Sequence, residues 1–281
     1  MAMDEKWLGQ RLQAMRTQAG LTQQILCQKA GLSYSTLTKI ERGAIKAPSI
    51  FTIQSIADVL GVSLDELLGS APKKVVRHRS KSGVSFVYFD INGCLVRFYH
   101  QAFTRLAELS GAPADVVETA FWHYNDEVCR GEMTMDAFNK AFAKDLQLDS
   151  LNWPDYYLET IEPIEEMHDI VRWAAQNYRV GLLTNTMPGL VKTMLQKGLL
   201  PDIDYEVIID SSEAGAIKPE AKIYQLAESK AKCPPAEILL IDDSRTNLMA
   251  AEKHGWHVLW FDDYRPDESI ARIKDALDPA D

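Results

Sequence analysis

The sequence predicts two domains of different classes: an all-α bundle at residues 1–70, and an α/β domain with a doubly wound parallel sheet at residues 84–281. Two observations predict the second class. The apolar run at residues 84–96 breaks off at Asp90, as a parallel strand buried on both faces does before its loop. From Ile164 onward, helical and strand-like segments alternate, which is typical of a doubly wound sheet. The first seventy residues show helical periodicity instead.

The composition is that of an ordinary globular protein, with 46% hydrophobic and 25% charged residues. No apolar stretch approaches the length of about 20 residues that a membrane span needs. The N-terminus is polar and lacks the apolar segment of a secretory signal, so we expect a cytoplasmic protein without a membrane partner. The four cysteines are widely separated and form no CxxC pair, which predicts neither a zinc site nor a disulfide framework.

The charge is unevenly distributed along the chain. Residues 1–70 hold seven Lys and Arg against six Asp and Glu, residues 71–85 hold five against none, and the remainder holds 18 against 34. We therefore predict a basic linker at residues 71–83 between the two domains. A solvated tether is one interpretation of this linker, and an arm that follows DNA phosphates is another.

Helices in the first domain follow from their periodicity and caps. An amphipathic segment at residues 6–19 ends at Gly20. Thr22 and Ser33 cap the next two helices, which continue to Ala30 and Glu41 with a turn at Gly31 between them. A fourth helix opens at Pro48 and Ser49, and residues 62–68 complete the bundle.

The run LTQQILCQKAGLSYSTLTKIERG, followed by IADVLGVSLDELL, resembles the helix-turn-helix of phage repressors and the Xre family. The resemblance implies double-stranded DNA as a partner, with the third helix in the major groove, and a homodimer on paired half-sites. The near-neutral charge of this domain leaves a protein-interaction or dimerisation module as an alternative. Carried over by position, the expected DNA-binding residues are Gln23, Tyr34, Ser35, Thr36, Lys39, Arg42 and Lys46.

In the second domain, helical segments at about residues 98–163 interrupt the α/β alternation and predict a helical insertion after the first strand. The alternation then resumes. Strands are expected at 179–184, 205–209, 237–242 and 257–261, with helices at 164–175, 189–197, 221–230 and 247–254. Because ligands of such sheets bind at the carboxyl ends of the strands, Asp90, Thr184 and the pair Asp242 and Asp243 are expected along one edge.

Four segments carry the chemistry of this domain: FDINGCLV, RVGLLTNT, GAIKPEAKIY and EILLIDDSRTN. In this order they resemble the motifs of the haloacid dehalogenase (HAD) superfamily of phosphohydrolases, over roughly two-thirds of the chain. The resemblance implies a HAD/Rossmann-like sheet, with the insertion as a C1 cap that closes over the site. It also implies Mg²⁺ as cofactor and a phosphorylated small molecule as ligand.

The resemblance assigns a role to each motif residue. Asp90 is the nucleophile, and Lys218 neutralises charge between it and the phosphate. Thr184 and Asn185 belong to the phosphate-binding group with Lys218, and Ser244 and Asn247 steady the acidic loop. The metal ligands implied are Asp90, the main-chain carbonyl of Asn92, Asp242 and Asp243.

Asn92 departs from the family pattern. Phosphatases of this superfamily carry a second Asp at that position, which protonates the leaving group and then deprotonates water. An amide does neither, so we expect hydrolysis to be weak or absent, while metal binding through the main-chain oxygen survives. General acid–base catalysis contributes about 10²- to 10⁴-fold to a rate.

These observations favour a DNA-binding transcriptional regulator whose phosphatase-like domain senses a phosphorylated metabolite. The alternative is an active Mg²⁺-dependent phosphohydrolase with an accessory DNA-binding domain. A purely structural module leaves the metal-and-phosphate set unexplained. Dehalogenases also lack the second Asp, but they need no metal, and the acidic pair Asp242 and Asp243 argues for one.

Overall fold

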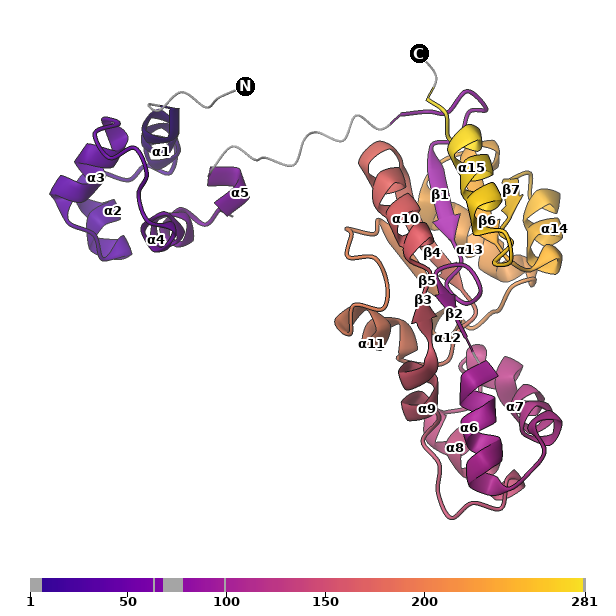
Figure 1. Ribbon diagram of the computed structural model, residues 1–281. Coiled ribbons are helices and arrows are strands. Elements are labelled where there is room, and N and C mark those ends of the chain that lie inside the picture. The colour runs from indigo at the N-terminus through magenta and orange to yellow at the C-terminus, as the bar shows by residue number, and fades with distance from the viewer. Residues whose placement is uncertain (1–6, 63, 68–77, 99, 280–281) are drawn as a thin grey trace. The chain divides into compact units, whose positions relative to one another are not determined.

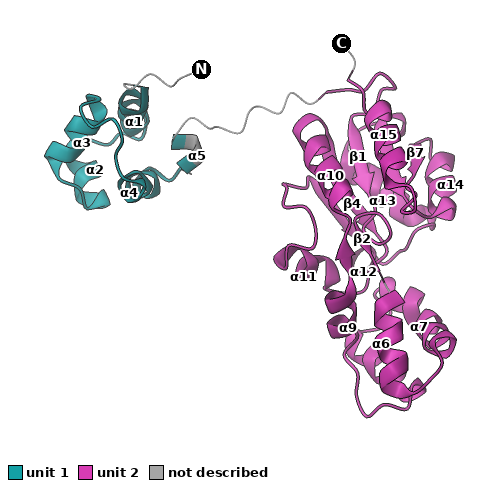
Figure 2. Ribbon diagram, in the orientation of Figure 1, with its two compact units in different colours: residues 1–76 teal, residues 77–281 magenta. Residues whose placement is uncertain are grey.

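The computed structural model describes residues 7–62, 64–67, 78–98 and 100–279 (Figure 1). The chain divides into two compact units, Met1–Val76 and Arg77–Asp281, each described by itself (Figure 2). The all-α and α/β classes expected for the two parts are both confirmed. Within the described ranges, none of the helices is both long and apolar enough to cross a membrane.

The N-terminal unit is a bundle of short helices around one apolar core. Thr22, Ser33 and Ser49 each accept a hydrogen bond from the first turn of the helix that follows, which satisfies an otherwise unpaired backbone amide. Gly31, at φ 67°, ends the second helix and turns the chain into the third. The helices are α1 (Trp7–Gln18), α2 (Gln23–Ala30), α3 (Tyr34–Glu41), α4 (Ile50–Leu60) and α5 (Leu64–Leu67).

The C-terminal unit is built on a parallel sheet, which in the described residues has the strand order β5-β4-β1-β6-β7. The strands are β1 (Phe86–Phe89), β4 (Arg179–Thr184), β5 (Val207–Asp210), β6 (Ile238–Asp242) and β7 (His257–Trp260). β1 lies between β4 and β6, so both of its edges are paired and all four of its side chains are buried. This central place explains why its sequence is uniformly apolar.

Helices cover both faces of the sheet (Figure 1). Phe86 and Tyr88 of β1 pack on one face with α13 and α14, while Val87 and Phe89 pack on the other with α10 and α11. These helices are α10 (Glu165–Asn177), α11 (Leu190–Gln196), α12 (Ser211–Ala214), α13 (Ala221–Ala231), the 3₁₀ turn η1 (Pro235–Glu237), α14 (Arg245–Lys253) and α15 (Pro266–Ala276). The sequence does not predict α12 and α15.

The insertion after β1 forms a separate helical layer, the cap, whose aromatic core includes Phe121 and Trp153. Its ends are joined by a short antiparallel pair of strands that the sequence does not predict. The cap also contacts the sheet domain directly. Arg130 Nε donates to Glu220 Oε1 at 2.7 Å, and Gly131 presses against the backbone of Ser212. The cap elements are β2 (Val96–Arg97), α6 (His100–Ser110), α7 (Ala114–Cys129), α8 (Met135–Asp145), α9 (Trp153–Thr160) and β3 (Glu162–Pro163).

The predicted linker at residues 71–83 is divided by the structure. Residues 71–77 lie outside the described residues, whereas residues 78–83 are bound to the C-terminal unit. The amide of His78 donates to Asn177 O at 2.7 Å, and Lys81 pairs with Asp278 at 2.6 Å. These contacts hold the last part of the basic segment on the α/β domain, while the role of the linker as a tether or as an arm along DNA stays a prediction.

Candidate functional site

An acidic cluster lies at the carboxyl edge of the sheet. Asp90 follows β1, Asp242 ends β6 and Asp243 comes next in the chain. One carboxylate oxygen of each lies within 4.8 Å of those of the others. Asp90 and Asp242 are buried and Asp243 is partly exposed. The parallel arrangement of β1 and β6 therefore brings together the acidic residues that the sequence places after separate strands.

Lys218 enters this cluster from the loop between α12 and α13. Its Nζ lies 2.8 Å from Asp90 Oδ1 and 2.6 Å from Asp242 Oδ2, and the side chain is fully buried. Asn185 holds the loop in place, because its Oδ1 accepts from the Lys218 amide at 2.7 Å and its Nδ2 donates to the Lys218 carbonyl at 2.8 Å. The Asn185 side chain, expected to bind phosphate, is thus engaged in holding Lys218.

The cluster is electrostatically unbalanced, because three carboxylates meet the ammonium group of Lys218. Burial raises the pKa of Asp90 to about 7, a shift that Lys218 opposes and Asp242 reinforces. Burial and the neighbouring Asp242 raise the pKa of Asp243 to about 6. Burial alone would lower the pKa of Lys218, but attraction to Asp242 and Asp90 overcomes it and raises that pKa. A bound cation would relieve this excess of negative charge.

The two residues of the acidic pair have different surroundings. Asp242 accepts from the Ser244 amide at 2.8 Å, from Asn247 Nδ2 at 3.1 Å and from Lys218 at 2.6 Å, which occupies both of its oxygens. The Asp243 carboxylate faces Gly93, where a Cβ would lie 2.2 Å from Asp243 Oδ2. Glycine at position 93, with φ 83°, therefore leaves room for the one carboxylate of the pair that stands open.

Thr184 contributes a buried hydroxyl at the end of β4. Its Oγ1 is inaccessible to solvent and has no hydrogen-bond partner among the residues that the structure describes. Buried hydroxyl groups are nearly always hydrogen-bonded in folded proteins. An unsatisfied donor beside an acidic cluster and a buried lysine is therefore a candidate contact for a ligand oxygen, which is the chemistry that the sequence predicts for this residue.

The side chain of Asn92 is held at both of its polar atoms. Its Oδ1 accepts a hydrogen bond from the hydroxyl of Tyr157, which is buried in α9 of the cap. Its Nδ2 donates to the Asn185 carbonyl at 3.3 Å. Aspartate at this position would still accept from Tyr157, but it would turn a carboxylate oxygen toward the Asn185 carbonyl. Tyr157 carries no mark of this role in the sequence, because the contact joins residues 65 positions apart and leaves no local signal.

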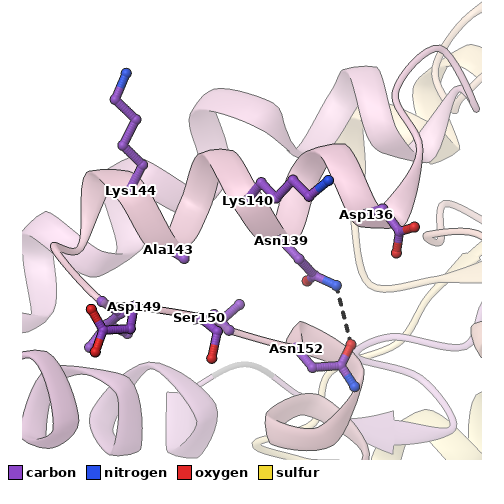
Figure 3. A pocket seen from close by; sticks show the side chains of 10 residues that line it. Asp136, Asn139, Lys140, Ala143, Lys144, Asp149, Ser150 and Asn152 are labelled. Carbon is purple, nitrogen blue, oxygen red and sulfur yellow. Dashed lines mark hydrogen bonds between the residues drawn. The ribbon is translucent and has the colours of Figure 1, made fainter.

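A hollow of about 840 Å³ lies within the cap, between α8 and the segment that leads to α9 (Figure 3). Asn139 Nδ2 donates to Asn152 Oδ1 across it at 3.2 Å. Its charged lining residues are of both signs: Lys140 and Lys144, and Asp136 and Asp149. None of the residues that line this hollow belongs to the cluster of Asp90, Asp242 and Asp243, so the hollow is not part of that candidate site.

In the N-terminal unit, polar side-chain contacts join α1, α2 and α3. Arg16 Nε donates to Glu41 Oε1 at 2.7 Å, and Gln23 Nε2 donates to Glu41 Oε2 at 2.6 Å. The hydroxyl of Tyr34, itself half exposed, donates to Gln23 Oε1 at 2.9 Å. Gln23 is therefore bonded at both ends of its amide, and α2 and α3 are joined through it.

The remaining predicted DNA contacts differ in how accessible they are. Ser35 and Lys39 on α3, and Arg42 and Lys46 beyond it, are exposed. Thr36 is half-buried, and its hydroxyl lies 2.7 Å from the hydroxyl of Ser33, the residue that caps the N-terminus of α3. Thr36 thus contributes to the start of α3.

The fold and the cluster define a HAD-like α/β domain joined to a helix-turn-helix domain. A model of the haloacid dehalogenase-like hydrolase family matches residues 85–255, and a helix-turn-helix model matches residues 12–67. The chain belongs to the haloacid dehalogenase-like hydrolase family, and its N-terminal part is a helix-turn-helix domain of DNA-binding regulators. Both resemblances seen in the sequence are confirmed.

Known proteins resemble the two parts separately. The uncharacterized HTH-type transcriptional regulator YazB of Bacillus subtilis is 43% identical over 65 residues, 23% of this chain and 93% of YazB. Acyl-CoA dehydrogenase family member 10 of Mus musculus is 24% identical over 204 residues, 68% of this chain but only 19% of the mouse protein. A HAD family enzyme of Bacteroides thetaiotaomicron, crystallised with magnesium and inorganic phosphate, shares the fold with a TM-score of 0.55 at 18% identity, over 64% of this chain and 95% of that chain.

Proposed function

We propose that this protein is a DNA-binding transcriptional regulator whose HAD-like domain binds Mg²⁺ and a phosphorylated metabolite and hydrolyses it slowly or not at all. The observation that carries the proposal is the state of Asn92. Its amide is bonded to Tyr157 and to the Asn185 carbonyl, and an amide does not act as a general acid or base at neutral pH. The residues proposed to bind the ligand are present. The residue expected to act as acid and base in hydrolysis is instead an amide, whose side chain is fixed by two hydrogen bonds.

The residues at the sheet edge fit Mg²⁺, which prefers oxygen ligands. Asp90, Asp243 and the main-chain carbonyl of Asn92 would hold the ion, and Gly93 leaves room beside Asp243. Asp242, whose oxygens already accept from Lys218, would orient the lysine and the acidic loop rather than bind the metal directly. When bound, the cation supplies the positive charge that three clustered carboxylates and a phosphate require.

Phosphate binding would use the buried ammonium group of Lys218 and the hydroxyl of Thr184. Lys218 places a buried positive charge 2.8 Å from Asp90, where it can neutralise a phosphate oxygen. The Thr184 hydroxyl would donate to another oxygen and so gain the partner it lacks among the described residues. The magnesium and phosphate found with the Bacteroides enzyme support this proposal by analogy of fold.

The regulator role rests on the helix-turn-helix unit. We propose that α3 enters the major groove of double-stranded DNA, where Tyr34, Ser35 and Lys39 contact bases and Arg42 and Lys46 contact phosphates. Gln23 would act chiefly by orienting Tyr34, to which it is bonded. A homodimer on two half-sites is the arrangement that such a domain favours.

The DNA-contact assignment is tested with Lys39→Ala and a matched control, Lys29→Ala on the exposed side of α2. Sequences bound by the native chain are first selected from a random duplex pool, and affinities are then measured by fluorescence anisotropy at two salt concentrations. We expect Lys39→Ala to weaken binding and alter the selected sequence, while Lys29→Ala leaves the selection unchanged. Equal effects of the two variants would exclude α3 as the reading helix.

An active phosphohydrolase with an accessory DNA-binding domain is the second candidate. The intact set of Asp90, Thr184, Lys218 and Asp243 favours it, because these residues would suffice for transfer to the nucleophile.

The two candidates are separated by Mg²⁺-dependent hydrolysis of an activated aryl phosphate and of a panel of sugar and nucleotide phosphates. Native protein is compared with Asn92→Asp, and Asp90→Asn serves as the blank. The proposed function predicts a rate for Asn92→Asp that exceeds the native rate by up to about 10²- to 10⁴-fold. Turnover by the native chain that exceeds the Asp90→Asn blank and equals that of Asn92→Asp would instead identify a working phosphohydrolase.

A further inference from the structure

We propose that Asp90 is phosphorylated by acyl phosphates and that the resulting aspartyl phosphate persists, so that the HAD-like domain is a covalent phosphorylation switch. The inference rests on the proposed function, because it uses the same phosphate site. It adds a class of phosphoryl donor and a second stable state of the chain. Three features of the site carry it: the nucleophile and its cradle, the leaving group that the site can release, and the treatment of water.

The nucleophile and its cradle are assembled in the structure. Asp90 is 6% exposed, and Lys218 Nζ stands 2.8 Å from its Oδ1. Thr184 adds a hydroxyl that is without a partner among the described residues. A phosphoryl group attached to Asp90 would gain the charge of Lys218 and the hydrogen bond of Thr184. Both groups would stabilise the product as well as the transition state.

The leaving group is restricted by the absence of an acid at position 92. A sugar phosphate must release an alkoxide, a leaving group nearly as basic as hydroxide. Such a group needs a proton as it departs, and the amide of Asn92 is too weak an acid to supply it. An acyl phosphate releases a carboxylate, whose conjugate acid has a pKa of about 4. Acyl phosphates are therefore a class of donor that this site can use without acid catalysis.

The transfer step is balanced without any further reactant. A carboxylate oxygen of Asp90 forms a bond to phosphorus while the bond from phosphorus to the acyl oxygen breaks. The leaving carboxylate takes the electron pair and needs no proton at neutral pH. The products are one free carboxylate and one aspartyl phosphate on the chain.

Persistence follows from the surroundings of Asn92. Hydrolysis of the aspartyl phosphate requires a base that removes a proton from the attacking water, and an amide cannot serve. Tyr157, the buried partner of Asn92, is no substitute, because its hydroxyl already donates its proton in a hydrogen bond to Asn92 Oδ1. The two hydrogen bonds of Asn92 also hold its side chain in place. Position 92 thus lacks the second half of a phosphatase cycle.

The test uses the full chain, Mg²⁺ and acetyl phosphate as the probe, with intact-mass spectrometry as the readout. After removal of the probe, the phosphorylated fraction is followed in time for the native chain, Asp90→Asn and Asn92→Asp. Hydroxylamine, which cleaves acyl phosphates but not phosphate esters, identifies the linkage. Phosphate release is measured in parallel, and a thermal melt with Mg²⁺ and inorganic phosphate reports whether the site binds its ligands at all.

We expect one hydroxylamine-sensitive phosphoryl group on the native chain and none on Asp90→Asn. Its half-life should shorten by about 10²- to 10⁴-fold in Asn92→Asp, the range that a general base contributes. A hexose phosphate in place of acetyl phosphate should leave the native chain unmodified.

Several outcomes would overturn the inference. A native chain that is stabilised by Mg²⁺ and phosphate but never phosphorylated refutes the switch and leaves the proposed function standing, whereas the loss of both refutes the two together. Steady release of many phosphates per native chain shows turnover, and makes His100, which lines a hollow together with Asp243, the first candidate for the base. Equal half-lives in the native chain and Asn92→Asp exclude position 92 as the cause of persistence.

Discussion

Replacement of Glu41 by alanine is expected to destabilise the helix-turn-helix unit severely. Glu41 is buried at the end of α3, and its carboxylate accepts from Arg16 Nε at 2.7 Å and Nη2 at 3.2 Å, and from Gln23 Nε2 at 2.6 Å. The side chain of Arg16 is only 11% exposed. Glu41→Ala would leave a nearly buried guanidinium without its counter-ion, together with an unpaired amide.

The magnitude follows from the burial of the pair. Removal of one partner of a buried ion pair costs about 3–5 kcal/mol of folding free energy, because the remaining charge is left uncompensated. Stability amounts to roughly 0.05–0.15 kcal/mol per residue in native proteins, which is about 3–9 kcal/mol for a unit of about 60 residues. Glu41→Ala therefore removes much of the stability of this unit. Arg16 retains one bond, from Nη1 to the Leu21 carbonyl at 2.7 Å, which does not replace the charge.

Hydrogen–deuterium exchange resolved by peptide is the assay, because it follows the two units separately in the full chain. Peptides from α1 to α4 should exchange roughly 10²- to 10⁴-fold faster in Glu41→Ala, since 1.36 kcal/mol corresponds to a factor of ten. Peptides from the sheet domain should be unchanged. Asp169→Ala provides the matched control. The side chain of Asp169 is 80% exposed and pairs with Arg172, and exposed ion pairs of this kind contribute about 1 kcal/mol or less to stability.

A second variant separates charge burial from other losses. The double change Arg16→Met with Glu41→Leu removes both charges, so it should restore much of the protection lost in Glu41→Ala. The reasoning is refuted if Glu41→Ala costs no more than Asp169→Ala.

Two further predictions concern the cap and the α/β domain. Gly131→Ala should lower the free energy of unfolding by about 1–3 kcal/mol more than Gly111→Ala does. Both glycines have positive φ, but only a Cβ at position 131 would meet the Ser212 carbonyl oxygen, at 2.3 Å. Equal losses in urea denaturation would contradict the described contact between the cap and the sheet domain. Burial lowers the pKa of His168 from 6.5, although its Nε2 lies 3.1 Å from the Leu95 carbonyl. The folded chain thus holds this proton more weakly than the unfolded chain, so the stability that His168 provides above about pH 6.5 is lost on acidification. The difference in unfolding free energy between the native chain and His168→Gln should shrink from pH 7 to pH 5, and a constant difference would show that His168 does not titrate in this way.

Local sequence patterns suffice for much of the fold. Thr22 and Ser33 cap α2 and α3 as expected, and the strand expected at residues 179–184 has those bounds. In each case the signal lies within a few neighbouring residues: a capping hydroxyl before an apolar period, or a continuous apolar run. Elements without such a signal were missed. α12 has four residues and β2 and β3 have two each, too few for a period to be recognised, and they form through contacts with distant parts of the chain.

The candidate site divides in a similar way. Asp90, Thr184 and Asp242 are marked in the sequence by their place after apolar runs, and the parallel sheet brings their strand ends to one edge. The roles of their neighbours were not visible in the same way. Asn185 is expected from the sequence to bind phosphate, but its side chain makes two hydrogen bonds to the backbone of Lys218, 33 residues away.

The sequence by itself determined the two domain classes, the order of the reactive residues along the chain, and the substitution of an amide at position 92. These follow from residue type and local spacing, which the chain carries whether folded or not. Only the tertiary structure decided that Tyr157 of the cap bonds to Asn92, that Asp242 is saturated by donors while Asp243 stands open, and that Lys81 is paired on the α/β domain. Such contacts join residues far apart in sequence. They depend on how the helices and strands pack, so no local sequence pattern predicts them.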